Sequence, residues 1–112
     1  MRSQASVDGS AESFLAHSTG AGGSDLVITV PADPDQFWVV DWIMVSYAAA
    51  PTAGKVTVSI NGVEYINHHI TAGGLTLVDL NCPLVPNECA SGALVVTLAN
   101  GAQAKAITVR YR

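Results

Sequence analysis

The sequence has few charged residues, and the scarcity already removes several classes of protein. Only 12% of its 112 residues are Asp, Glu, Lys or Arg, against about 25% in an average soluble protein. The five basic residues are scattered along the chain, so they form no stripe that could neutralise phosphates, and we expect no nucleic-acid partner. No apolar run approaches the ~18 to 20 residues of a membrane-spanning helix, so we expect no membrane partner.

Cysteine is also scarce, and its spacing excludes the common cysteine chemistry. Cys82 and Cys89 lie in CPLVPNEC, too far apart for a CxxC redox or zinc pair and without a second pair of ligands nearby. Free thiols are therefore expected rather than a disulfide. The N-terminal MRSQASVDGS lacks the apolar stretch of a secretory signal, which indicates synthesis in the cytoplasm.

Hydrophobic residues, by contrast, are plentiful. They make up 49% of the chain, and the mean hydropathy is +0.34. A monomer that exposed so much apolar surface would be prone to aggregate. We therefore expect part of the surface to be covered by other chains, either further copies in a dimer or trimer or a different protein.

The hydrophobic pattern is that of β-strands. Short alternating runs bounded by Gly, Pro, Asn and Asp predict seven strands and no convincing helix. They cover residues 26–30, 37–48, 55–60, 63–70, 75–80, 93–99 and 104–111. Strands of this length and spacing indicate a single all-β domain, a β-sandwich of the jelly-roll or Greek-key type.

Two Asn-Gly dipeptides predict hairpins. A two-residue turn at Asn61-Gly62 suits type I′ geometry and pairs Ile60 with Val63 and Val58 with Tyr65. The core face of this hairpin would then hold Val56, Val58, Ile60, Val63 and Tyr65. Ile66, His68 and Ile70 would lie on the outer face as candidates for a partner contact. A second hairpin is expected around Asn100-Gly101, with Leu94, Val96, Leu98, Ile107, Val109 and Tyr111 as core rows.

The first 24 residues differ in composition from the rest. They are rich in Ser, Gly and Ala, and Phe14 and Leu15 are their only pair of large apolar side chains. Such a segment buries too little to repay its ordering entropy alone. We expect residues 1–24 to form an extended arm that docks Phe14 and Leu15 into a neighbouring subunit, ahead of a sandwich domain at residues 25–112. The alternative is an arm that packs back on its own domain as an extra edge strand.

The sequence offers little catalytic or metal chemistry. His68 and His69 are adjacent in a strand, so they point to opposite faces and would share a metal only across a bulge. Asp33 and Asp35 flank Pro34 in a turn, where Asp is favoured for local hydrogen bonds. No nucleophile, phosphate-binding or metalloprotease motif occurs. We expect no catalytic residues, no metal and no cofactor, and therefore no enzyme.

The strand at residues 37–48 has a carboxylate and two tryptophans whose surroundings need an explanation. Asp41 lies in an apolar run and needs a counter-charge, for which Arg110 and Arg112 are natural candidates. Strict alternation places Trp38 and Trp42 on one face. They would form a core row or a subunit contact, since Val40 and Met44 share that face. The alternative is a sugar-stacking platform of Trp38, Trp42, Tyr47 and Tyr65.

Three segments resemble a family of small proteins encoded in tailed-phage and prophage genomes. They are WIMVSYAAAPTAGKVTVSINGV, the ITAGG turn at residues 70–74 and the C-terminal VVTLANGAQAKAITVRYR, within residues 38–112. Some phage proteins of this size and all-β character are capsid decoration, or cement, proteins. The resemblance implies a small phage protein. Its size, its composition and its N-terminal arm favour a structural virion protein on the capsid surface that binds and stabilises the shell of major capsid protein. A tail, neck or fibre component and a carbohydrate-binding module are the alternatives. Expected contact residues are Phe14, Leu15, Trp38, Trp42, Ile66, His68 and Ile70.

Overall fold

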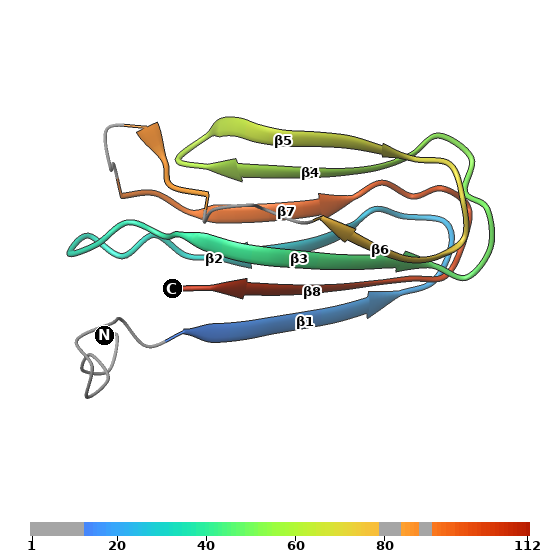
Figure 1. Cartoon of the computed structure of the whole chain (residues 1–112), viewed down its shortest axis with the longest axis horizontal. Coiled ribbons are helices and arrows are strands. Elements are labelled where there is room, and N and C mark those ends of the chain that lie inside the picture. The colour runs from blue at the N-terminus through green and yellow to red at the C-terminus, as the bar shows by residue number, and fades with distance from the viewer. Residues whose placement is uncertain (1–12, 79–83, 88–90) are drawn as a thin grey trace.

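Two four-stranded antiparallel sheets lie face to face in the structure, a computed structural model that describes residues 13–78, 84–87 and 91–112. Sheet A has the strand order β1 (Phe14–Gly20), β8 (Lys105–Tyr111), β3 (Val40–Tyr47) and β6 (Gly74–Val78). Sheet B has the order β2 (Leu26–Val30), β7 (Leu94–Leu98), β4 (Gly54–Ile60) and β5 (Val63–Ile70). Figure 1 shows the two layers and the long connections between them.

The strand pairing is that of a jelly roll. β4 pairs with β5, β3 with β6, β2 with β7 and β1 with β8, all antiparallel. The chain is thus one long hairpin, with its tip between β4 and β5, rolled so that successive pairs fall alternately in sheet B and sheet A. The wrapped hairpin closes through two further pairings, β3 with β8 and β4 with β7. The predicted all-β sandwich is confirmed, and its connections are of the jelly-roll type.

The tip of the hairpin is the predicted turn. Asn61 and Gly62 both have positive φ, 54° and 76°, as a type I′ turn requires. Ile60 pairs with Val63 as predicted, but a bulge leaves Tyr65 without a partner in β4, so that Val58 pairs with Ile66. The predicted pairing beyond Glu64 is therefore wrong by one residue.

The bulge exchanges the two faces of β5. Ile66 lies opposite the buried Val58 and packs against the core, and Ile70 is only 5% exposed. The expectation that these isoleucines face outward is thus wrong. Val63, expected in the core, is 47% exposed beside the turn at the tip of the hairpin.

The second predicted hairpin is not formed. β7 belongs to sheet B and β8 to sheet A, so the segment between them crosses from one sheet to the other. An Asn-Gly dipeptide permits the left-handed backbone needed for a tight turn but does not dictate that the flanking strands pair. The predicted core rows are nevertheless confirmed. Leu94, Val96, Leu98, Ile107 and Val109 are fully buried, and Tyr111 is partly buried against them.

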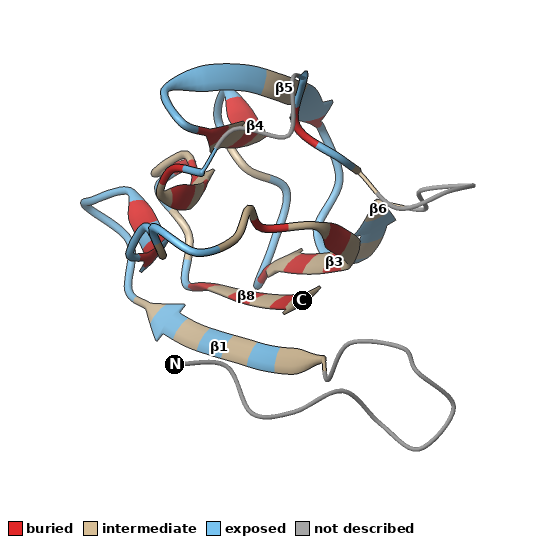
Figure 2. Cartoon of the chain, turned by 90° about the vertical axis from the view of Figure 1, so that its left-hand side faces the viewer, coloured by how far each residue is buried: buried red, intermediate tan, exposed pale blue. Residues whose placement is uncertain are grey.

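The core is a single apolar layer between the sheets. Buried and more exposed residues alternate along β2, β3, β4, β7 and β8, and Figure 2 shows the alternation as bands of colour along the strands. Val, Ile and Leu supply most of this layer, as expected of β-branched and aliphatic side chains on a pleated surface. Tyr47 is the largest fully buried side chain.

Part of the expected N-terminal arm belongs to the sandwich. Phe14–Gly20 forms β1 and pairs residue for residue with β8, which is the edge-strand alternative. The Phe14 ring packs on Tyr111 with centroids 5.5 Å apart. At the other end of β1, the buried Lys105 ammonium donates to the carbonyl oxygens of Ala21 and Ser24 at 2.6 and 2.9 Å. Residues 1–12 of the expected arm lie outside the described residues.

Tyr47 joins two connections at the end of the sandwich where β3 leads into β4 and β7 leads into β8. Its hydroxyl donates to the carbonyl oxygen of Ala99 at 2.5 Å and accepts from the Lys55 amide at 3.4 Å. Burial raises the pKa of Tyr47, and the Asp25 carboxylate adds to the rise, while the Lys55 amide opposes it.

Replacement of this hydroxyl is the first test of the fold. Tyr47→Phe should lower the free energy of unfolding by about 1 to 2 kcal/mol near pH 7, because the buried carbonyl of Ala99 loses its donor. Because the pKa of Tyr47 is raised above the ordinary 10.0, above pH 10 the unfolded chain releases this proton while the folded one keeps it. Stability of the wild type should therefore fall as pH rises above 10, and more steeply than that of Tyr47→Phe. Urea titrations of the wild type and Tyr47→Phe across this pH range measure the free energy of unfolding of each protein. Equal slopes of this free energy against pH would contradict the role given to the Tyr47 hydroxyl.

Two glycines with positive φ offer a matched pair of substitutions that tests how tightly the connection from β7 to β8 packs against Tyr47. A Cβ on Gly101 (φ 61°) would lie 2.7 Å from Tyr47 Cε1 and 2.8 Å from Pro51 Cβ, whereas one on Gly62 (φ 76°) meets nothing within 4 Å. Gly62→Ala should therefore cost only the left-handed strain, about 1 kcal/mol. Gly101→Ala should cost that and a further ~1 to 3 kcal/mol of overpacking. Equal losses in thermal or urea unfolding would show that the crossing is not packed in this way.

Candidate interaction surface

The strand registers define which residues lie on the face of sheet A that points away from the core. Successive side chains in a strand point to opposite faces, and the residues that alternate with the buried ones therefore lie together outside. Trp42 lies beside Arg110, and Met44 lies between Thr108 and Leu77. We call the following set the sheet A outer face: Leu15, His17, Thr19, Trp42, Met44, Ser46, Leu75, Leu77, Ala106, Thr108 and Arg110.

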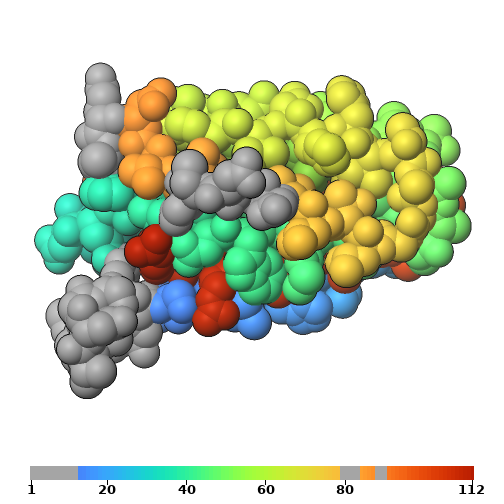
Figure 3. Space-filling model, in the orientation of Figure 1, coloured from blue at the N-terminus to red at the C-terminus, as the bar shows by residue number. Residues whose placement is uncertain are grey.

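The sheet A outer face is rich in exposed apolar side chains. Leu75 is 70% exposed, Leu15 58% and Leu77 55%, and Trp42 and Met44 are half-buried beside them. Within this set Arg110 is the single residue with a permanent charge. In Figure 3, β6, β3, β8 and β1 reach the surface one below another. A soluble domain rarely leaves such a patch uncovered.

The corresponding face of sheet B is polar. By the same alternation it presents Val27, Thr29, Lys55, Thr57, Ser59, Glu64, Asn67, His69, Val95 and Thr97. Val27 is the large hydrophobic residue of this set that is strongly exposed, at 48%. The two faces of the sandwich therefore differ in kind, and the excess of apolar residues in the composition is concentrated on one of them.

A second bulge decides which tryptophan reaches the surface. Along β3 the pairing with β8 passes from Val40 to Trp42 and skips Asp41. Trp38 consequently lies in the core, 8% exposed, with its indole N–H donating to the carbonyl oxygen of Pro31 at 3.0 Å. Trp42 lies on the outer face. The prediction that both indoles share a face is wrong, and with it the sugar-stacking platform built on that pair.

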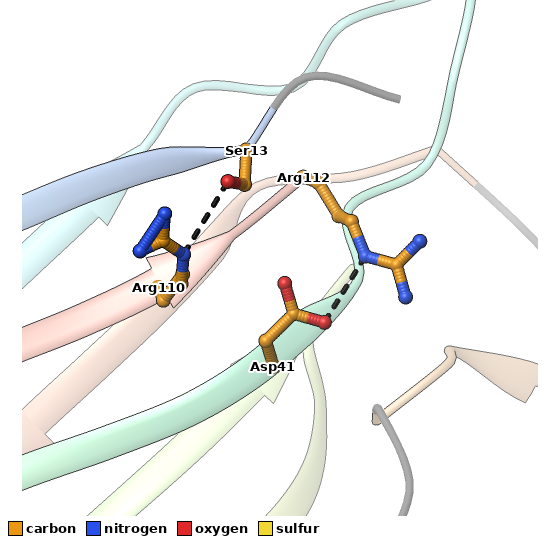
Figure 4. A network of polar contacts seen from close by, with 4 residues as sticks. All are labelled: Ser13, Asp41, Arg110 and Arg112. Atoms are coloured by element: carbon orange, nitrogen blue, oxygen red, sulfur yellow. Dashed lines mark hydrogen bonds and ion pairs between the residues drawn. The ribbon is translucent and has the colours of Figure 1, made fainter. Parts of the chain in front are cut away.

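The displaced Asp41 finds its predicted partner. Its Oδ1 accepts a hydrogen bond from Arg112 Nε at 3.0 Å, an ion pair at the end of β3. Beside it, Arg110 Nε donates to Ser13 Oγ at 3.3 Å and ties the start of β1 to β8 (Figure 4). Both arginines are thus engaged within the chain. The ion pair also explains how a carboxylate is accommodated in an otherwise apolar strand.

The remaining predicted contact residues are divided between the core and other surfaces. Phe14 and Ile66 pack against the core and Ile70 belongs to it, whereas His68 is exposed on β5. His68 lies opposite Val56 and His69 opposite Lys55, so the two imidazoles lie on different faces. Among the described residues, no group of three or more His, Cys, Asp and Glu side chains gathers to hold a metal. Cys82 and Cys89 lie outside these residues.

An aromatic groove of about 510 Å³ opens at the end of the sandwich where β1 begins and β8 ends. Tyr111 packs edge-on against Trp38 there, with centroids 5.4 Å apart. The polar groups of the rim hold the connection from β2 to β3. Asp33 accepts from the Asp35 amide at 2.9 Å and from Gln36 Nε2 at 2.6 Å, the local bonding predicted for this turn.

Leu75 and Leu77 are the surface residues that the sequence did not single out. Both faces of the run LTLV carry apolar residues, Leu75 and Leu77 on one and Val78 on the other, so the pattern alone does not decide which side points outward. The pairing of β6 with β3, which places Leu75 beside Ser46 and Leu77 beside Met44, settles it.

Comparisons with known proteins add no identity. No protein-family model matches the chain, and no curated protein matches its sequence. A search of the described residues for a membrane-spanning helix found none.

The sheet A outer face should contribute to association and not to folding. The double substitution Leu75→Ser and Leu77→Ser should change the free energy of unfolding by less than about 1 kcal/mol, because both side chains are more than half exposed. Binding of a hydrophobic dye to the folded protein should fall. A loss of several kcal/mol in urea unfolding would mean that these leucines are part of the core.

Proposed function

We propose that the protein is a structural virion protein of the capsid decoration type, which binds the shell of major capsid protein through the sheet A outer face. One observation carries the proposal. The single large apolar and nearly uncharged surface in the described part of the chain covers all four strands of one sheet. The resemblance of residues 38–112 to small phage proteins supplies the biological setting, on the capsid surface of a particle assembled in the host cytoplasm.

The physical demands on a decoration protein agree with this surface. Such a protein makes many identical contacts around a symmetric shell, each of which is modest, and multivalency provides the overall strength. The centre of a protein interface is depleted of charge and enriched in aromatic residues and Met. On the sheet A outer face Trp42 lies beside Arg110, and Met44 lies between Thr108 on β8 and Leu77 on β6.

The geometry changes the set of contact residues. Leu15 and Trp42 remain, since both lie on the sheet A outer face, and Met44, Leu75 and Leu77 join them. Trp38, Phe14, Ile66 and Ile70 are withdrawn, because they face or adjoin the core. His68 is withdrawn as well, because it lies on β5 of sheet B. A tail or neck component would use the same surface against a different neighbour, so the partner and not the face is what an experiment has to decide.

A co-sedimentation assay tests the proposal. The full chain is mixed with shells assembled from the major capsid protein encoded in the same genome, and binding is measured against concentration. The wild type should sediment with the shells to saturation. The Leu75→Ser, Leu77→Ser variant should bind at least ~100-fold more weakly, since burial of each leucine contributes about 1.5 to 3 kcal/mol.

Two exposed valines provide the matched control. Val27 and Val63 are 48% and 47% exposed and lie outside the sheet A outer face, so the variant Val27→Ser, Val63→Ser removes exposed apolar side chains elsewhere on the protein and should bind like the wild type. Failure of the wild type to bind shells would refute the decoration role. Equal weakening by both double variants would refute the assignment to the sheet A outer face.

A further inference from the structure

β1 is an edge strand without the features that normally protect an edge. It occupies the end of sheet A and pairs with β8 alone among the described strands. Its seven residues, FLAHSTG, pair with β8 without a register shift and include no proline and no Asp, Glu, Lys or Arg. About half of its backbone N–H and C=O groups therefore point away from β8, in a row suited to another strand.

The other edge strands are protected in recognised ways. β5 carries the bulge at Tyr65 and an exposed acidic residue, Glu64. β2 and β6 are short, at five residues each, and β2 is followed at once by Pro31. Short strands, bulges, charges and prolines all discourage pairing with another chain. Among the edges that the structure describes, β1 is the exception.

We propose that β1 pairs antiparallel with β1 of a second copy of this chain, about a two-fold axis. Such an isologous contact is the commonest form of self-association, and the side chains of β1 suit it. Full overlap of seven residues centres the axis on His17, which lies opposite its own symmetry mate. Leu15 then meets Thr19, and Phe14 meets Gly20, so that each of these two large apolar side chains faces a smaller one.

The pairing has a consequence for the sheet A outer face. Leu15, His17 and Thr19 are the exposed residues of β1 and belong to that face. Joining two β1 edges therefore produces one continuous eight-stranded sheet whose outer surface carries both apolar patches side by side. The proposal does not depend on the capsid role, since it rests on the edge and not on the face.

Charged substitutions of His17, the residue at the proposed two-fold axis, test both the contact and its register. Residues directly opposite each other in an antiparallel pair have Cβ atoms about 4.5 to 5.5 Å apart, and like charges there oppose pairing. The wild-type full chain should have twice its monomer mass of 11.6 kDa in size-exclusion chromatography with light scattering. His17→Glu and His17→Lys should each weaken the dimer at least tenfold, and an equimolar mixture of the two should restore it.

Controls separate this contact from other modes of association. Thr29→Glu places a charge at an exposed position of the edge strand β2 and should leave the dimer intact. Leu75→Ser, Leu77→Ser should also leave it intact. Circular dichroism confirms that each variant is folded. A monomeric wild type, or folded His17 variants that stay dimeric or whose mixture does not re-associate, would overturn the proposal. So would a dimer lost only in the leucine variant, which would locate the contact on the sheet A outer face.

Discussion

The structure depends on one constraint. Its eight short strands enclose a single apolar layer, which can bury only one face of each strand. Each strand has two faces, and the jelly roll buries one face of nearly every strand between the sheets. Whatever lies on the second face is left outside. In sheet B that second face is polar. In sheet A it includes Leu15, Trp42, Met44, Leu75 and Leu77, so the surface that is left uncovered follows directly from the pairing and the alternation.

Two bulges determine how this constraint is met. The bulge at Asp41 turns Trp42 outward and keeps Trp38 inside, and the bulge at Tyr65 turns Ile66 and Ile70 inward. Each shifts a short run of side chains from one face to the other, because the period of a strand is two residues. The identity of the candidate surface therefore depends as much on these irregularities as on the regular strands.

Much of the fold could be predicted from the sequence, and the failures have a common physical cause. The strand at residues 26–30, the turn at Asn61-Gly62 and the core rows of the last two strands follow from local patterns. A bulge leaves no comparable signal, so the shared face of Trp38 and Trp42 and the outward facing of Ile66 and Ile70 were predicted wrongly. The local pattern likewise gives no signal of which distant strands pair. The pairing of β1 with β8 was for that reason only the less favoured of two interpretations.

The most direct test of the central claim is hydroxyl-radical footprinting of the protein, free and bound to its assembly. Trp42 and Met44 are readily oxidised side chains on the sheet A outer face, and His69 is an oxidisable residue on the outer face of sheet B. The account predicts that binding protects Trp42 and Met44 and leaves the oxidation of His69 unchanged. Protection of His69 with Trp42 and Met44 still reactive would contradict it, because the covered face would then be that of sheet B.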